Sequence, residues 1–560
     1  MAKLVQTLRR SVRPSVLALA LALLAVGCHA DPDDAAGQAK ELSDPVRREF
    51  AMGNLTRLYA KALTDSKSNR SAPNVKQFDD VTYEQLIKTY IDAPEDTQNG
   101  ERIMALLYEM RDPRALPALL KALEWRTEVN EEHAITAARA LAVITLTPAQ
   151  KTEAAQKVAA ALDRVSGKRP VDNRMRIEFL RTLGELNDPS AVAVLTKVAL
   201  RQSEEQNFLI NNLAVEQLGR LADPSTVPAL IEALYLFDPA NPGNRLTQAV
   251  PAALVRIGRP ALAPLIAVLE GKDPKALASS KAWVEAVRQR NAQAAEQMNP
   301  AAEMKKEASF ALGTLGFSDA IPALLVAAAD SDKGVQLGAA VALASINRTD
   351  AETPKIREVL VKTYAGQEKV QRMQVLRAMQ HLYDAGLQPF LFTVAKTPEE
   401  ELPDIPVIAL NAFSMMANKA EAAQANGFIA ADKSPFKATF ETQNRALLKA
   451  ATECDVDSAC WTKKLDEKDE NVVRKATYML ARVGRGKPAV IKALVAKIDH
   501  PKELVRGDVL SALDFVAVQG SPEAVAKIDQ LRKAEEGRGS WNHIKERALA
   551  TQAKLAARGK

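Results

Sequence analysis

The chain has 560 residues, of which 47% are apolar and only 5% are aromatic, and its formal net charge is +6. Its length is several times that of a usual single domain, so the chain is either several domains or one elongated array. The abundance of Ala and Leu with few aromatic residues favours closely packed helices and argues against a strand-rich protein.

Residues 1–27 have the features of an export signal. Four basic residues precede an apolar stretch, 16–26, that is too short to span a bilayer. The ending Ala-Val-Gly-Cys resembles the lipobox of bacterial lipoproteins, which implies that Cys28 carries a lipid anchor. In those lipoproteins an Asp after the Cys tends to retain the protein in the inner membrane; His29 stands here, so we expect the outer membrane, facing the periplasm. Ordinary cleavage nearby, with a free Cys28, is the alternative.

Removal of the signal lowers the formal charge from +6 to +2, because it takes away four basic residues and no acidic ones. A nearly neutral mature chain lacks the basic stripe of a nucleic-acid-binding protein. We therefore expect no nucleic-acid partner.

Two segments without repeats follow the signal. Residues 28–44 are acidic and small, which predicts a tether. Residues 45–100 contain two helical patterns around a polar loop, which predicts an N-terminal helical cap for a stacked array.

From residue 101 a sequence motif recurs. A helix with an apolar stripe, often ending in Leu-Gly-x-Leu, leads to a turn, and a second helix with an apolar stripe follows. The turns, aligned at Asp112, Thr147, Asp188, Asp223, Arg259 and Asp319, are 35, 41, 35, 36 and 60 residues apart. Periods of this size are typical of stacked helical hairpins. Asp-Pro at three of the turns supplies a helix cap followed by a tolerated Pro. A further Pro one turn later, as in Pro117 and Pro228, should kink the helix or delay its start.

The pattern resembles the HEAT-repeat family, in the short bacterial form found in phycobilisome lyases. Asp223 to Leu234 carry the likeness for the first helix of a repeat, and Ala308 to Gly316 carry it for the second. The resemblance implies an all-α, HEAT-like α-solenoid of stacked antiparallel helix pairs. It says little about function, because this scaffold is widely reused.

Repeats are expected over 101–270, over 306–420 with degenerate later units, and over 471–560 with a C-terminal cap. Residues 271–305 are polar and predict an exposed helical insertion, and 421–470 predict an irregular segment. Such insertions are either contact sites or spacers.

The irregular segment contains Cys454 and Cys460, the two cysteines left after Cys28. Two cysteines so close in an exported protein predict a local disulfide. A metal site is the alternative, but no His is near and the spacing does not fit zinc ligands. We expect no metal and no cofactor.

No phosphate-binding loop, zinc-binding helix or nucleophile elbow is present in the sequence. The five His residues are far apart, and no catalytic residue can be nominated. We therefore expect a non-catalytic scaffold that binds another envelope protein. An enzyme related to the lyases that acts on a chromophore, and a binder of cell-wall glycan, remain alternatives.

The partner surface is predicted on the second helices of the repeats. The Leu-Gly-x-Leu register places residues four apart on one helix face, and in HEAT-like stacks this face usually lines the concave side. Ala105 and Glu109 hold these places in the first repeat. Arg and aromatic residues there suit a protein interface, although solvated charge pairs are the plain alternative. The residues predicted to bind the partner are Arg181, Glu185, Glu216, Arg220, Phe310, Tyr478 and Arg482.

Overall fold

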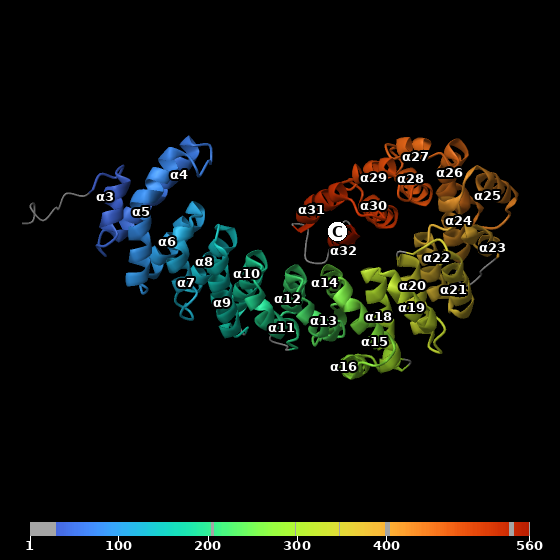
Figure 1. The fold of residues 1–560 in the computed structure, drawn as a ribbon, viewed down its shortest axis with the longest axis horizontal. Helices are drawn as coiled ribbons and strands as arrows, with labels where there is room; N and C mark the ends of the chain where they lie inside the picture. The colour runs from blue at the N-terminus through green and yellow to red at the C-terminus, as the bar shows by residue number, and fades with distance from the viewer. Residues whose placement is uncertain are drawn as a thin grey trace, which may run out of the picture. The chain divides into compact units, whose positions relative to one another are not determined.

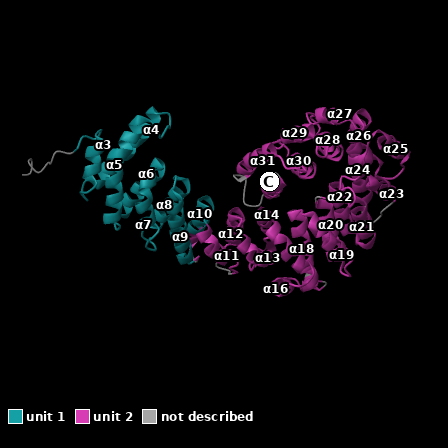
Figure 2. Cartoon of the chain, viewed as in Figure 1, with its two compact units in different colours: residues 1–166, 174–188 teal, residues 167–173, 189–560 magenta. Residues whose placement is uncertain are grey.

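The computed structural model describes residues 30–167, 169–202, 206–296, 298–346, 348–397, 404–536 and 543–558. Over these residues the fold is all-α apart from one short hairpin, and helices follow one another as antiparallel pairs (Figure 1). The predicted all-α, HEAT-like solenoid is confirmed. The chain forms two compact units, 1–166 with 174–188, and 167–173 with 189–560 (Figure 2). The division falls inside the block 101–270, which the repeat pattern treats as continuous.

Unit 1 contains the N-terminal helices and the first repeats. Its elements are α3 (Ala35–Glu41), α4 (Arg48–Asp65), α5 (Pro73–Asp92), α6 (Thr97–Met110), the 3-10 turn η1 (Pro113–Ala115), α7 (Leu116–Ala122), α8 (Glu131–Val143), α9 (Pro148–Arg164) and most of α10 (Pro170–Leu186). The first four residues of α10 belong to unit 2.

Unit 2 contains the rest of the chain. Its helices are α11 (Val192–Ala199), α12 (Phe208–Leu221), α13 (Val227–Ala233), α14 (Ala249–Ile257), α15 (Leu262–Leu269), α16 (Pro274–Arg290), α17 (Ala292–Ala295), α18 (Pro300–Leu315), α19 (Ile321–Ala327), α20 (Lys333–Ser345), α21 (Thr353–Gly366), α22 (Lys369–His381), α23 (Gln388–Lys396), α24 (Asp404–Met416), α25 (Lys419–Ala431), α26 (Lys437–Cys454), α27 (Ser458–Lys464), α28 (Glu470–Val483), α29 (Pro488–Val495), α30 (Glu503–Val516), α31 (Pro522–Glu536) and α32 (His543–Arg558). The 3-10 turns η2 (Pro189–Ala191), η3 (Pro224–Thr226), η4 (Arg259–Ala261), η5 (Ser318–Ala320) and η6 (Ala385–Leu387) precede first helices, and β1 (Phe237–Asp238) pairs with β2 (Asn241–Arg245).

The repeated turn is built by local capping. The Asp112 carboxylate accepts a hydrogen bond from the Arg114 backbone N–H at 2.8 Å, and Asp223 accepts one from Ser225 at the same distance. A 3-10 turn follows each Asp-Pro, and the α-helix begins only afterwards, with Pro117 or Pro228 in its first turn. The Pro therefore delays the helix start, as one of the two sequence interpretations predicted.

The glycine of the Leu-Gly-x-Leu motif lies where the second helices of two neighbouring repeats approach each other closely. A Cβ added at Gly219 of α12 would lie 2.7 Å from the Cα of Ala253 in α14. A Cβ at Gly313 of α18 would lie 2.8 Å from the Cα of Ala342 in α20. Distances below 3 Å are closer than nonbonded carbon atoms pack, so a larger residue would push these helices apart. Close stacking of neighbouring repeats explains why this motif recurs.

The predicted tether is wrong for the residues that the structure describes. From Ala30 onward the segment is folded, and α3 packs against α4 and α5. Ala39 and Leu42 are buried, and the Ala30 backbone N–H donates to the Glu41 carboxylate at 2.8 Å. The acidic composition suggested solvation, but a few small apolar residues on one helix face are enough to bury it.

Two predicted interruptions also differ from the structure. The segment 421–470 is not irregular, because α25, α26 and α27 occupy most of it. The insertion helix α16 is not fully exposed: Trp283 is buried and its indole N–H donates to the Pro242 carbonyl at 3.0 Å. Both segments depart from the repeat period but keep the local apolar spacing that buries a helix face.

Candidate functional site

The second helices of unit 1 expose the face on which the partner surface was predicted. The spacing places Ala105 and Glu109 of α6 beside each other, and Arg181 and Glu185 of α10 occupy the equivalent places. All four residues are exposed, and the Arg181 side chain is 61% exposed.

The helix between them, α8, presents Arg139 and Val143 in the same spacing. Both are exposed, Val143 at 40%. Helix α8 contacts α6 on one side, and on the other the Thr182 hydroxyl of α10 donates to the Ala138 carbonyl at 2.9 Å. Three adjacent helices therefore share one exposed ridge, which we call the unit 1 ridge: Ala105, Glu109, Arg139, Val143, Arg181 and Glu185. Arg139 and Val143 escaped the sequence analysis because α8 lacks the Leu-Gly-x-Leu motif; the i, i+4 spacing alone could have found them.

Ion pairs connect the ridge to its surroundings without burying it. Arg139 pairs with Glu178 of α10 at 3.1 Å, and Arg181 pairs with the same Glu178 at 3.2 Å. Glu109 pairs with Arg70 at 3.2 Å. The pair of Arg70 and Glu109 is well exposed and contributes at most about 1 kcal/mol to stability, so a partner could exchange it at little cost. Glu178, which is 15% exposed, is the more buried member of the other two pairs.

The predicted partner-binding residues in unit 2 do not form a continuous exposed surface. Tyr478 is 6% exposed, and its ring lies 5.0 Å from that of Tyr383. Arg482 is half-buried and donates to the Met416 carbonyl at 2.6 Å. Glu216 pairs with Lys545 at 3.1 Å. Arg220 is half-buried at the end of α12, and Phe310 lines a cavity. Tyr478 in particular is corrected from a surface residue to a core residue.

Closure of unit 2 on itself explains this burial. The second helices α14, α18, α20, α22, α24, α28 and α30 contact one another in turn, and α32 then contacts both α30 and α14 (Figure 1). The ion pair between Glu216 and Lys545 joins residues 329 positions apart. The faces predicted to be concave and open thus meet around the inside of a closed ring.

The inside of the ring contains a cavity of about 450 Å³. Its walls come from α14, α18, α30, α32, α20 with the segment after it, and the end of α22 with the segment after it. Three aromatic residues, Phe310, Tyr383 and Phe515, line it together with five charged ones: Arg348, Asp514, Glu546, Arg547 and Lys554. Cavities of this size with mixed walls are typical of small-molecule sites.

Burial changes the proton affinity of groups in and beside this cavity. Burial raises the pKa of Glu546 to about 7; the nearby Glu216 acts in the same direction, whereas Lys545 and Arg256 oppose it. Burial also lowers the pKa of His381, and the positive charge of Arg547 adds to that effect. Burial lowers the pKa of Arg348 to about 10, helped by Arg485.

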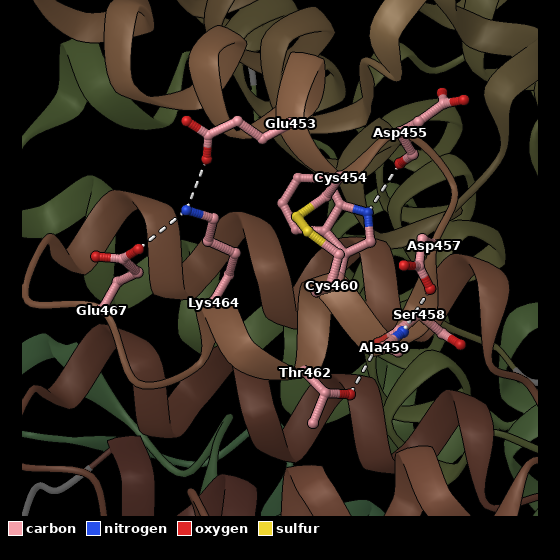
Figure 3. The surroundings of a disulfide bond; sticks show 11 residues. Glu453, Cys454, Asp455, Asp457, Ser458, Ala459, Cys460, Thr462, Lys464 and Glu467 are labelled. Carbon is pink, nitrogen blue, oxygen red and sulfur yellow. Dashed lines mark hydrogen bonds and ion pairs between the residues drawn. A yellow bond between two sulfur atoms is a disulfide. The ribbon is translucent and has the colours of Figure 1, made fainter.

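The two mature cysteines are joined in the structure, Cys454 at the end of α26 to Cys460 in α27 (Figure 3). The Trp461 indole N–H donates to the Asp455 carbonyl at 2.8 Å, and Lys464 pairs with Glu453 at 2.8 Å and with Glu467 at 2.9 Å. The bond therefore fixes the turn between two helices.

The expected anchor, Cys28, lies outside the described residues. Among the residues from 30 onward that the structure describes, no three His, Cys, Asp or Glu side chains are grouped to hold a metal ion. No single described helix has the length and apolarity to cross a bilayer. The sharply bent pair of α14 with 259–269 is long and apolar enough when taken together, and most of its apolar side chains are buried in unit 2.

Comparison with known proteins supports the repeat assignment. The family described as PBS lyase HEAT-like repeat matches residues 101–124 and 213–235, which correspond to α6 with α7 and to α12 with α13. Comparison with curated protein sequences yields no match.

Among solved structures, the karyopherin Kap121p bound to the SUMO protease Ulp1p is 13% identical, with 96% of this chain and 70% of that chain covered and a TM-score of 0.36. The Kap95:Nup1 complex is 12% identical, with 98% and 86% covered and a TM-score of 0.33. An engineered protein is 17% identical, with 85% and 98% covered and a TM-score of 0.22.

Proposed function

We propose that this chain is a non-catalytic scaffold of the cell envelope that binds another envelope protein through the unit 1 ridge. A lipid on Cys28 would hold it at the outer membrane, facing the periplasm. The observation that carries the proposal is the exposure of three matched residue pairs on adjacent helices of a HEAT-like solenoid.

The chemistry of the ridge suits a protein partner. Arg139 and Arg181 alternate with Glu109 and Glu185, and Val143 adds an exposed apolar residue. Mixed charge with an apolar centre matches protein interfaces better than it matches a phosphate or a uniformly charged polymer. Arg residues are also common where the binding energy of such interfaces concentrates.

The test is cross-linking of the anchored protein in cell envelopes, with mass spectrometry of what co-purifies. With the double variant Val143→Asp, Arg181→Glu, the amount of the main partner that co-purifies should be at least about tenfold lower than with the parent. Central interface residues often contribute more than about 1.4 kcal/mol to the binding free energy, which corresponds to that factor. Val326→Asp with Arg445→Glu is the matched control, because both residues are highly exposed and lie in unit 2. Equal recovery from all three proteins would exclude the ridge as the partner surface.

A further inference from the structure

Two arginine side chains that line the cavity inside unit 2 form no direct ion pair among the described residues. Arg348 is only 3% exposed and forms no ion pair among the described residues; Asp384, whose charge acts on Arg348, pairs instead with Arg357 at 2.9 Å. Its guanidinium donates to the Ala344, Ile346 and Leu382 carbonyls, and its Nε has no hydrogen-bond partner. A buried cation that is bonded only to neutral groups is costly, and an anion beside it would lower that cost.

A second cation lines the same cavity. Arg547, on α32, donates to the Gly507 carbonyl at 3.2 Å and makes no ion pair within the described residues. The negative groups nearby are otherwise engaged or weakened. Asp514 pairs with Lys554 at 2.9 Å and Arg558 at 2.6 Å, and Glu546 is partly protonated near neutral pH. The cavity therefore offers two guanidinium groups without carboxylate partners.

The remaining wall is apolar and aromatic. The Phe515 ring lies 4.8 Å from the Tyr383 ring and 5.5 Å from the Arg348 guanidinium carbon, and Phe310 lines the cavity from α18. Such rings hold the flat apolar part of a ligand, while the guanidinium groups orient its charged end.

We propose that this cavity binds a small organic anion with an apolar body, its charged group beside Arg348 and Arg547 and its apolar part against Phe310, Tyr383 and Phe515. Because Arg547 and the other α32 residues form one wall, the bound anion also holds α32 against the rest of the ring. This site lies in unit 2 and is independent of the partner surface proposed for unit 1.

The experiment is calorimetric titration of the full mature chain with three probes of one shape: 1-naphthoate, the neutral 1-naphthalenemethanol and the cationic 1-naphthylmethylamine. Naphthoate should bind at least tenfold more tightly than either of the others. Arg547→Gln should weaken naphthoate binding about tenfold, as expected for loss of one charge-assisted contact. Arg445→Gln, whose side chain is 79% exposed on α26, should bind naphthoate like the parent.

Two further measurements separate binding from loss of structure. Phe310→Ala, at a residue of α18 and not of α32, should also weaken naphthoate binding. The circular-dichroism spectra of all variants should match that of the parent. Amide exchange in α14 and α32 should slow when naphthoate is bound. Absence of naphthoate binding, equal binding of the neutral probe, or binding unaffected by both Arg547→Gln and Phe310→Ala would each overturn the proposal.

Discussion

Individual side chains in unit 2 that were predicted to be exposed make contacts within the closed ring instead. Tyr478 and Arg482 were predicted to face a partner, but Tyr478 packs on Tyr383, and Arg482 caps the end of α24 through the Met416 carbonyl. Glu546 shows the cost of this arrangement, because closure buries its carboxyl group near that of Glu216. Residues that the sequence pattern predicts on an exposed helix face are therefore buried where the solenoid closes.

The buried carboxyl group of Glu546 should make unit 2 sensitive to pH. Its pKa is about 7 in the folded protein against an ordinary value of 4.5, so the folded state retains a proton that the unfolded state releases between these values. The free energy of unfolding should therefore fall as pH rises from 4.5 to 7 and stay level above. Glu546→Gln removes this loss, and the variant should be more stable than the parent by about 3 kcal/mol at about pH 8.

Urea unfolding of the two proteins from about pH 4.5 to about pH 8 measures this difference, which should vanish at the acidic end of the range. Glu441 on α26, whose side chain is 41% exposed, provides the control, because Glu441→Gln should follow the parent at every pH. A Glu546→Gln variant that also follows the parent would show that closure does not bury a protonated carboxyl group.

Among the elements, α3 changes the interpretation of the N-terminal region most. The acidic segment that was predicted as a tether contributes a helix whose residues Gln38 and Ala39 are buried in unit 1, and Leu42, directly after the helix, is buried as well. The Gln38 amide donates to the Ala30 carbonyl at 2.9 Å, so the packed structure already includes Ala30. Helix α3 is thus part of the N-terminal cap.

Leu42→Ala distinguishes a packed cap from a tether. Leu42 has no exposed surface, so its truncation should lower the free energy of unfolding of unit 1 by about 2–5 kcal/mol. Leu504→Ala, at a residue 57% exposed on α30, should change stability by less than about 0.5 kcal/mol. Amide exchange in α4 and α5 measures the effect locally. Unchanged exchange there after Leu42→Ala would restore the tether interpretation.

At the scale of the whole molecule, each compact unit has its own proposed role. Unit 1 exposes the ridge on α6, α8 and α10 and contains the residues that follow the proposed anchor. Unit 2 closes through α14 and α32, and a cavity of about 450 Å³ lies between these and neighbouring helices. The same repeat thus supports an outward surface in one unit and a cavity between helices in the other.

Replacement of Cys28 by Ser should release the whole protein from membranes. The lipobox-like ending implies lipidation there, and stable anchoring needs two acyl chains, which only modification of this residue would supply. Membrane fractionation with mass spectrometry of the mature N-terminus measures both attachment and acylation, and Cys454→Ser with Cys460→Ser is the control that keeps the anchor. A Cys28→Ser protein that still fractionates with membranes would contradict the anchor.

The sequence by itself determined the helices, the repeat and the local bonds. Asp112 and Asp223 cap their turns, the following Pro residues set the helix starts, and Cys454 and Cys460 are near enough to join, because each feature depends on residues close in the chain. The Leu-Gly-x-Leu motif likewise indicated which helices stack, and the structure shows the close approach of Gly219 to Ala253 that requires it.

Only the tertiary structure decided which of these faces remain open. Small rotations between successive repeats accumulate along a solenoid, and no single repeat encodes their sum. In unit 2 that sum brings Lys545 to Glu216 across 329 residues, buries Tyr478 and encloses Arg348, whereas the ridge around Arg181 stays exposed in unit 1. Long-range closure depends on the geometry of every intervening helix pair, so a pattern of neighbouring residues could predict the repeat but not the ring.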